Sequence, residues 1–141
     1  MTLIIDSSGL LAAIDDKQED HLAAKHVVES AARPLLLSPF VLAELDYLVL
    51  TRYGREQELA LLGEVGRGAY RLERFFSEDV ARAQEVIRQY AGLRELGLAD
   101  ASNVVLAERY NVLDILTLDE RDFRMLRGPR GRSFQLLPAG L

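Results

Sequence analysis

The sequence predicts an α/β fold built around a mostly parallel sheet. Short apolar runs alternate with longer amphipathic stretches, capping and turn residues separate the two, and the spacing suits strand–helix–strand units. The runs of strand type cover residues 3–5, 34–38, 70–74, 112–118 and 134–138. At 141 residues the chain fits a single domain, 1–141, with enough apolar sequence for a real core.

The N-terminal half begins with a strand that feeds a capped turn. Residues 3–5 are apolar and run directly into Asp6-Ser7-Ser8-Gly9. The helices expected in this half cover 10–14, a stretch after Asp20, 38–54 and 57–65. Ser38-Pro39 predicts the start of the third, because serine caps well and proline suits the first turn. We expect the helix after Asp20 to bury Leu22, Ala23, Val27 and Val28.

The C-terminal half alternates in the same way. Helices are expected over 77–90 and 98–110, with a short one through Phe123 and Met125 and a loop at 128–131. In open parallel sheets, ligands bind beyond the carboxyl ends of the strands. Asp6 and Asp119 each directly follow an expected strand, so this edge is the first place to look for a site.

Composition narrows the possible functions. The chain has no cysteine, which excludes disulfides, thiolate nucleophiles and cysteine-based metal sites. No apolar run approaches the ~20 residues of a membrane span, and the first acid follows too early for a signal peptide, so we expect a cytoplasmic protein without a membrane partner. The net charge of −5 argues against a protein that binds nucleic acid. However, only two of the 17 basic residues are lysine, and the others are arginine, whose side chain suits contacts with phosphate.

Four acids are candidate metal ligands: Asp6, Glu44, Asp100 and Asp119. Asp6 ends the first strand, although an aspartate there can equally cap the next helix. Glu44 lies in the apolar stripe of residues 40, 41, 45 and 48, where a core-facing carboxylate is costly unless paired or metal-bound. A partner arginine, or a place at the edge of the stripe, would explain Glu44 without a metal.

Asp100 and Asp119 also have local explanations. Asp100 falls in the first turn of the 98–110 helix, where contact with the helix dipole stabilises by ~0.3–1 kcal/mol. Asp119 can cap the following helix, with Asp122 as an imperfect capping-box partner. Capping does not explain why every candidate acid falls at a strand end or at a helical position that faces the core.

Convergence of these carboxylates would require a counter-ion. Two carboxylates about 4 Å apart repel by roughly 4 kcal/mol at an effective dielectric of 20. A fold tolerates that repulsion only when cations or protons lie among the acids. Ligands that are all oxygen select hard cations, so we expect Mg²⁺ or Mn²⁺.

Four short segments resemble the signature segments of PIN domains, most closely those of VapC-type toxins. In order they are Leu3-Ile4-Ile5-Asp6-Ser7-Ser8, Ser38-Pro39 with Leu42-Ala43-Glu44, Leu98-Ala99-Asp100-Ala101, and Ile115-Leu116-Thr117-Leu118-Asp119-Glu120-Arg121-Asp122-Phe123. The resemblance spans residues 3–123, and the chain length suits a lone PIN domain. The stretch 55–95 carries no signature and says little about substrate.

The resemblance implies a three-layer α/β/α sandwich and a Mg²⁺- or Mn²⁺-dependent endoribonuclease, the toxin of a toxin–antitoxin pair. It also implies an RNA substrate, a homodimer, and inhibition by a small VapB-like antitoxin. The family's catalytic and metal-binding quartet falls on Asp6, Glu44, Asp100 and Asp119. Asp122 matches a variable fifth acidic position, Thr117 a hydroxyl residue beside the site, and Ser8 a small polar residue after the first acid.

The mechanism that follows from such a site is hydrolysis by water. Metal held by the acids would lower the pKa of a bound water, so no side chain need act as nucleophile. Glu44 would hold metal or orient the water. By resemblance, the products carry a 5′-phosphate and a 3′-hydroxyl.

Other functions find less support in the sequence. His21 and His26 are five residues apart and do not share a helix face, which argues against a paired-histidine ribonuclease. An aspartyl phosphotransfer domain would want a second aspartate two residues after Asp6, where Ser8 stands. A non-catalytic PIN-like module that binds RNA or protein is the other alternative, and the intact quartet argues against it.

Overall fold

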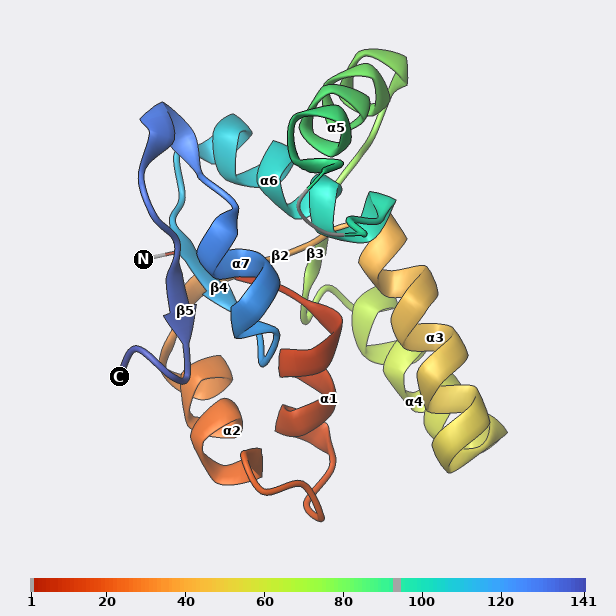
Figure 1. Ribbon diagram of the computed structural model, residues 1–141. Coiled ribbons are helices and arrows are strands. Elements are labelled where there is room, and N and C mark those ends of the chain that lie inside the picture. The colour runs from red at the N-terminus through yellow and green to blue at the C-terminus, as the bar shows by residue number, and fades with distance from the viewer. Residues whose placement is uncertain (1, 93–94) are drawn as a thin grey trace.

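A computed structural model describes residues 2–92 and 95–141 of the chain (Figure 1). In order, the elements are β1 (Thr2–Ile5), α1 (Ser7–Ile14), α2 (His21–Ser30), β2 (Ala32–Leu37), α3 (Pro39–Tyr53), α4 (Arg55–Gly66), β3 (Arg71–Leu72), α5 (Ser77–Tyr90), α6 (Leu98–Tyr110), β4 (Asp114–Leu116), α7 (Glu120–Met125) and β5 (Gln135–Leu137). These strands form one 5-stranded sheet in the order β3-β2-β1-β4-β5. Every pairing is parallel, which confirms the predicted α/β fold.

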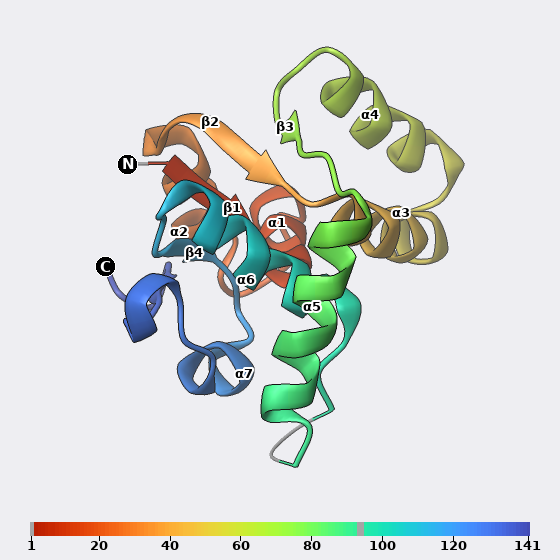
Figure 2. The ribbon, with the colours of Figure 1, turned by 90° about the horizontal axis from the view of Figure 1, so that it is seen from above.

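Helices cover both faces of this sheet. Successive side chains of a strand point to opposite faces, and β1 is buried on both. Leu3 and Ile5 pack in one apolar cluster with α1, α2 and α3, whereas Ile4 packs in a second cluster with α5 and α6. The expected three layers are therefore present, and α3 and α4 pack side by side beyond the β3 edge (Figures 1 and 2).

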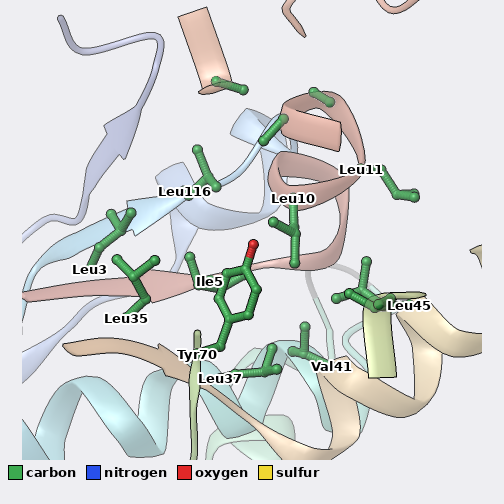
Figure 3. Close-up of a cluster of buried hydrophobic side chains, with 14 of the residues drawn as sticks. Leu3, Ile5, Leu10, Leu11, Leu35, Leu37, Val41, Leu45, Tyr70 and Leu116 are labelled. Carbon is green, nitrogen blue, oxygen red and sulfur yellow. The ribbon is translucent and has the colours of Figure 1, made fainter. Parts of the chain in front are cut away.

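The first apolar cluster anchors α1 and α3 close to the strand ends. Figure 3 shows Leu10 of α1 and Val41 and Leu45 of α3 gathered around Ile5 and Leu37. All five side chains are 0% exposed. Closely packed interiors move little, so the side chains that α1 and α3 carry keep fixed positions relative to β1.

Gly9 sets how closely α1 approaches the neighbouring strand. A Cβ atom at this position would lie 2.5 Å from the backbone oxygen of Leu116 in β4. No side chain fits in that space, so any other residue would push α1 away from the strand. The glycine of the predicted capped turn is thus needed for packing at the end of β1.

Several expected boundaries and one expected face are wrong. Helix α1 begins at Ser7 rather than at residue 10, β3 and β4 are shorter than the expected strands, and residues 129–131 form a turn of 3₁₀ helix instead of a plain loop. In α2 the residues packed on the sheet are 24, 27, 28 and 31, a stripe with helical spacing. Leu22 and Ala23 lie off that stripe and are exposed, Leu22 to 79%.

The order of the strands determines where a site can form. From β1 the chain adds β2 and β3 on one side of the sheet and then adds β4 and β5 on the other side. The order in which strands are added therefore reverses between β1 and β4. In open α/β sheets, ligands bind at this crevice, beyond the carboxyl ends of the two strands. Within the described part of the chain, no helix is long and apolar enough to cross a membrane.

Candidate active site

Asp6 lies at the carboxyl end of β1, in the crevice beside β4. Its backbone N–H donates to the Leu116 oxygen at 3.0 Å, which continues the pairing of β1 with β4. The side chain is 4% exposed, and its Oδ2 accepts hydrogen bonds from Thr117 Oγ1 at 2.7 Å and Ser8 Oγ at 3.3 Å. It makes no capping hydrogen bond to α1, all of whose residues are described. Its hydrogen bonds to side chains therefore connect the end of β1 to Ser8 of α1 and to Thr117 after β4.

Two hydroxyls tie α1 to the segment after β4. Thr117 Oγ1 accepts from the Asp119 N–H at 3.0 Å, and Ser8 Oγ accepts from the Leu118 N–H at 2.9 Å. The two hydroxyls lie 3.2 Å apart. Because both also bond the Asp6 carboxylate, they hold it against the β4 end.

Glu44 does not face the core. The buried side of α3 is formed by Val41, Leu45 and Val49, spaced four apart, and Glu44 is exposed beside them. The prediction of a core-facing carboxylate is wrong, and the alternative of a place at the stripe's edge is correct. From that edge Glu44 still reaches α1, where Oε1 accepts a hydrogen bond from Ser7 Oγ.

Asp100 occupies the first turn of α6 and is half-buried. Burial raises its pKa to about 7, and four carboxylates add to the rise: Asp6, Asp119, Asp122 and Glu44. Burial likewise raises the pKa of Asp6 to about 6; the Thr117 hydrogen bond opposes this, while the Glu44 carboxylate adds to it. Charges raise one another's pKa only at short range, so the predicted acids lie within one electrostatic field.

Asp119 has the local role that capping predicts. Its Oδ1 accepts from the Asp122 N–H at 3.2 Å at the start of α7. Asp122 itself is 7% exposed. Capping uses one oxygen of Asp119, and the same carboxylate acts on Asp100. The two roles are therefore compatible.

The donor set of this cluster fits a hard divalent cation in kind. Every candidate ligand is a carboxylate, and like charges so close together favour either protons or a cation among them. Across residues 2–92 and 95–141, no group of three or more histidine, cysteine, aspartate or glutamate side chains is arranged to hold an ion. The acids affect one another electrostatically, but their side chains do not surround a common point as metal ligands would.

Two polar residues of the site were missed by the sequence analysis. Ser7 binds Glu44, and Asn103 of α6 places Nδ2 3.5 Å from Asp6 Oδ1. A signal for Asn103 existed. It lies three residues after Asp100, on the same side of the helix, in a run from Ala101 to Ala107 that is otherwise almost wholly apolar.

Known proteins share this fold. The chain matches no protein-family model. Among solved structures, Mycobacterium tuberculosis VapC20, a sarcin–ricin loop cleaving toxin, superposes with a TM-score of 0.76 at 20% identity over 83% of this chain and 89% of that one. VapBC2 from Rickettsia felis, bound to a promoter DNA fragment, gives 0.67 at 18% identity over 96% and 98%.

Sequence comparison assigns the chain to the PIN-domain class of nucleases. Ribonuclease VapC26 of Mycobacterium tuberculosis (strain ATCC 25618 / H37Rv) is 45% identical over 136 residues, which is 96% of this chain and 100% of that protein. The chain belongs to the VapC family of PIN-domain ribonuclease toxins. Membership implies a nuclease that depends on a divalent metal ion, and it favours the enzyme over a non-catalytic module.

Proposed function

We propose that Asp6, Glu44, Asp100 and Asp119 form the active site of this ribonuclease and bind Mg²⁺ or Mn²⁺. The observation that carries the proposal is Asp100, whose pKa is raised by burial and by four surrounding carboxylates. Such repulsion destabilises a fold unless a cation offsets it. The acids gather where the strand order reverses, the usual position for a ligand in this kind of sheet.

The residues take different roles according to their surroundings. Asp6 is buried and held by two hydroxyls, so its carboxylate offers a fixed oxygen to a ligand. Glu44 is exposed and anchored by Ser7, which suits it to orient the attacking water or to complete the ligand set. Asp122 supports the site as an auxiliary acid. When bound by these acids, the cation would lower the pKa of water and offset charge on the scissile phosphate.

The substrate we propose is RNA, cleaved to products with a 5′-phosphate and a 3′-hydroxyl. Purified protein should cleave RNA in Mn²⁺ or Mg²⁺, lose activity in excess EDTA, and recover it when Mn²⁺ is restored. Gel analysis with end-specific labelling would read both the rate and the product ends. Cleavage that persists in EDTA would refute the metal site, because an excess of this chelator competes with a few carboxylates for the cation and removes it.

We propose further that a small VapB-like antitoxin binds the hollow between α1, α3 and α4. The solved neighbours from Rickettsia felis and Salmonella typhimurium are VapBC assemblies, which supports a partner of this kind. The hollow measures about 430 Å³ and combines apolar residues such as Ile14 with the acids Asp15, Asp16 and Glu64. A segment with apolar and basic side chains would complement it. On α1 and α3 the apolar side chains of Leu10, Leu11, Leu45 and Val49 are core, so they are unavailable to a partner.

Ile14→Glu should weaken antitoxin binding and leave RNA cleavage intact. Ile14 is 43% exposed at the rim, and a charge placed on an apolar anchor costs about 2 kcal/mol or more, roughly thirtyfold in affinity. Leu22→Glu is the matched control, since Leu22 is exposed on α2 and does not line the hollow. We expect a neighbouring gene to encode the antitoxin, and calorimetry with that protein would measure both affinities. Equal affinities for the two variants would place the partner elsewhere.

Two further properties complete the proposal. We propose a homodimer, as the family resemblance implies, and the exposed apolar side chains of Leu72, Phe76 and Val80 are available for its interface. A cytoplasmic location suits an enzyme that acts on cellular RNA.

A further inference from the structure

Asn103 is a buried amide whose hydrogen bonding is incomplete. Its side chain is 0% exposed in the middle of α6, among apolar neighbours of the second cluster. Nδ2 donates to Asp6 Oδ1 at 3.5 Å, a long hydrogen bond. Oδ1 has no hydrogen-bond partner among the described residues. The amide therefore touches the site on one side and is unsatisfied on the other.

Asn103 does not improve the stability of the fold. Leaving a buried acceptor unsatisfied costs roughly 1–3 kcal/mol, and an apolar side chain of the same shape would avoid that loss. Leucine has nearly the same shape and suits the apolar surroundings of α6. An unsatisfied buried group in a native fold needs an explanation, and departures from the packing rules are expected at functional or strained sites.

We infer that Asn103 is a positioning residue that fixes the carboxylate of Asp6 for metal binding. The inference rests on the proposed role of Asp6 as a ligand. Thr117 and Ser8 hold Oδ2 from one side, and Asn103 contacts Oδ1 from α6. Carboxylate ligands depend on such outer partners, whose loss weakens metal affinity by about 10–100-fold. Helix α6 thus carries Asp100 and, one turn later, the amide that orients Asp6.

Asn103→Leu should separate stability from metal binding. Without metal, its melting temperature should equal or exceed that of the wild type, because the unsatisfied amide is gone. The Mn²⁺ concentration that gives half of the maximal melting shift should rise about tenfold. Asn103→Ala provides a second variant if leucine overpacks α6. RNA cleavage at limiting Mn²⁺ should fall in parallel and recover at saturating Mn²⁺.

Ser102→Ala is the matched control on the same helix. Ser102 is equally buried and polar, but it bonds Ser38 and the Ala99 oxygen instead of an acid. Its loss should lower the metal-free melting temperature and leave the Mn²⁺ midpoint unchanged. In an Asp6→Asn background, Asn103→Leu should have no further effect on the midpoint, because the two changes act on one contact.

The outcomes distinguish this inference from the proposal beneath it. A wild type that responds to Mn²⁺, with an Asn103→Leu midpoint equal to its own, would overturn the positioning role and leave the metal site standing. A wild type that does not respond would overturn the metal site and the inference together. A tenfold shift that persists in the Asp6→Asn background would show that Asn103 acts through another group.

Discussion

Asp119→Asn should nearly abolish RNA cleavage while the metal-free protein stays as stable as the wild type. Asn caps a helix about as well as Asp, so the hydrogen bond from the Asp122 N–H is kept. The substitution removes one negative charge that raises the pKa of Asp100. Stability without metal should thus hold or rise slightly. Loss of a ligand should reduce cleavage by more than the roughly 10–100-fold expected for loss of an outer partner.

Asp20→Asn is the matched control for this prediction. Asp20 also stands at the start of a helix, α2, and its substitution changes the net charge by the same amount. The side chain is exposed and lies outside the acidic crevice. Its cleavage rate should equal that of the wild type. A melt without metal and a Mn²⁺-dependent cleavage assay supply both readouts. Folded Asp119→Asn with wild-type activity would reduce Asp119 to a cap and weaken the whole quartet.

Much of the fold could be predicted because its signals are local. Ser38-Pro39 starts α3 as expected, with Ser38 Oγ accepting from the Phe40 N–H at 3.1 Å, and apolar runs mark β1, the second half of β2, β4 and β5. Packing decided what local signals could not. The face that α2 buries depends on its angle to the sheet, and β3 is limited to two residues by its place at the sheet edge.

The sequence predicts where the candidate acids lie better than it predicts their surroundings, and their role as a site stays a prediction. Asp6 and Asp119 could be found from strand ends, since the end of a parallel strand is a fixed place in three dimensions. Glu44 was selected for the wrong reason. A stripe of helical spacing shows which face of a helix is apolar, but the sequence does not show where the buried part of that face ends. Asn103 contacts a residue that is distant in sequence, and only the packing of α6 against β1 brings the two together.

The pH dependence of stability follows from the two raised pKa values. Asp6 and Asp100 have pKa values of about 6 and about 7 in the folded protein, against 3.8 for the ordinary carboxyl. Between these limits the folded state binds more protons than the unfolded state, so the contribution of both groups to stability falls as pH rises. Below the unfolded pKa both states are protonated and the penalty disappears. The contribution of these two acids should therefore give the metal-free protein a higher melting temperature at pH 5.5 than at pH 7.5.

Cation binding should reverse this dependence. Carboxylates must be ionised to bind a metal, so Mn²⁺ should stabilise most where repulsion is greatest. At a concentration 100 times the Kd, a ligand specific to the folded state adds about 2.7 kcal/mol. In a domain of this size that corresponds to a rise of roughly 8 °C in Tm. Asp100→Asn should flatten the pH dependence and reduce the response to Mn²⁺.

The most direct test is the Tm of the wild type and of Asp100→Asn at pH 5.5 and 7.5, with EDTA and with Mn²⁺. We expect the metal-free wild type to lose stability between the two pH values relative to Asp100→Asn, and Mn²⁺ to raise its Tm by several degrees at pH 7.5 but much less at pH 5.5. A folded wild type whose Tm does not respond to Mn²⁺ at pH 7.5, and whose pH dependence matches that of Asp100→Asn, would contradict the metal site.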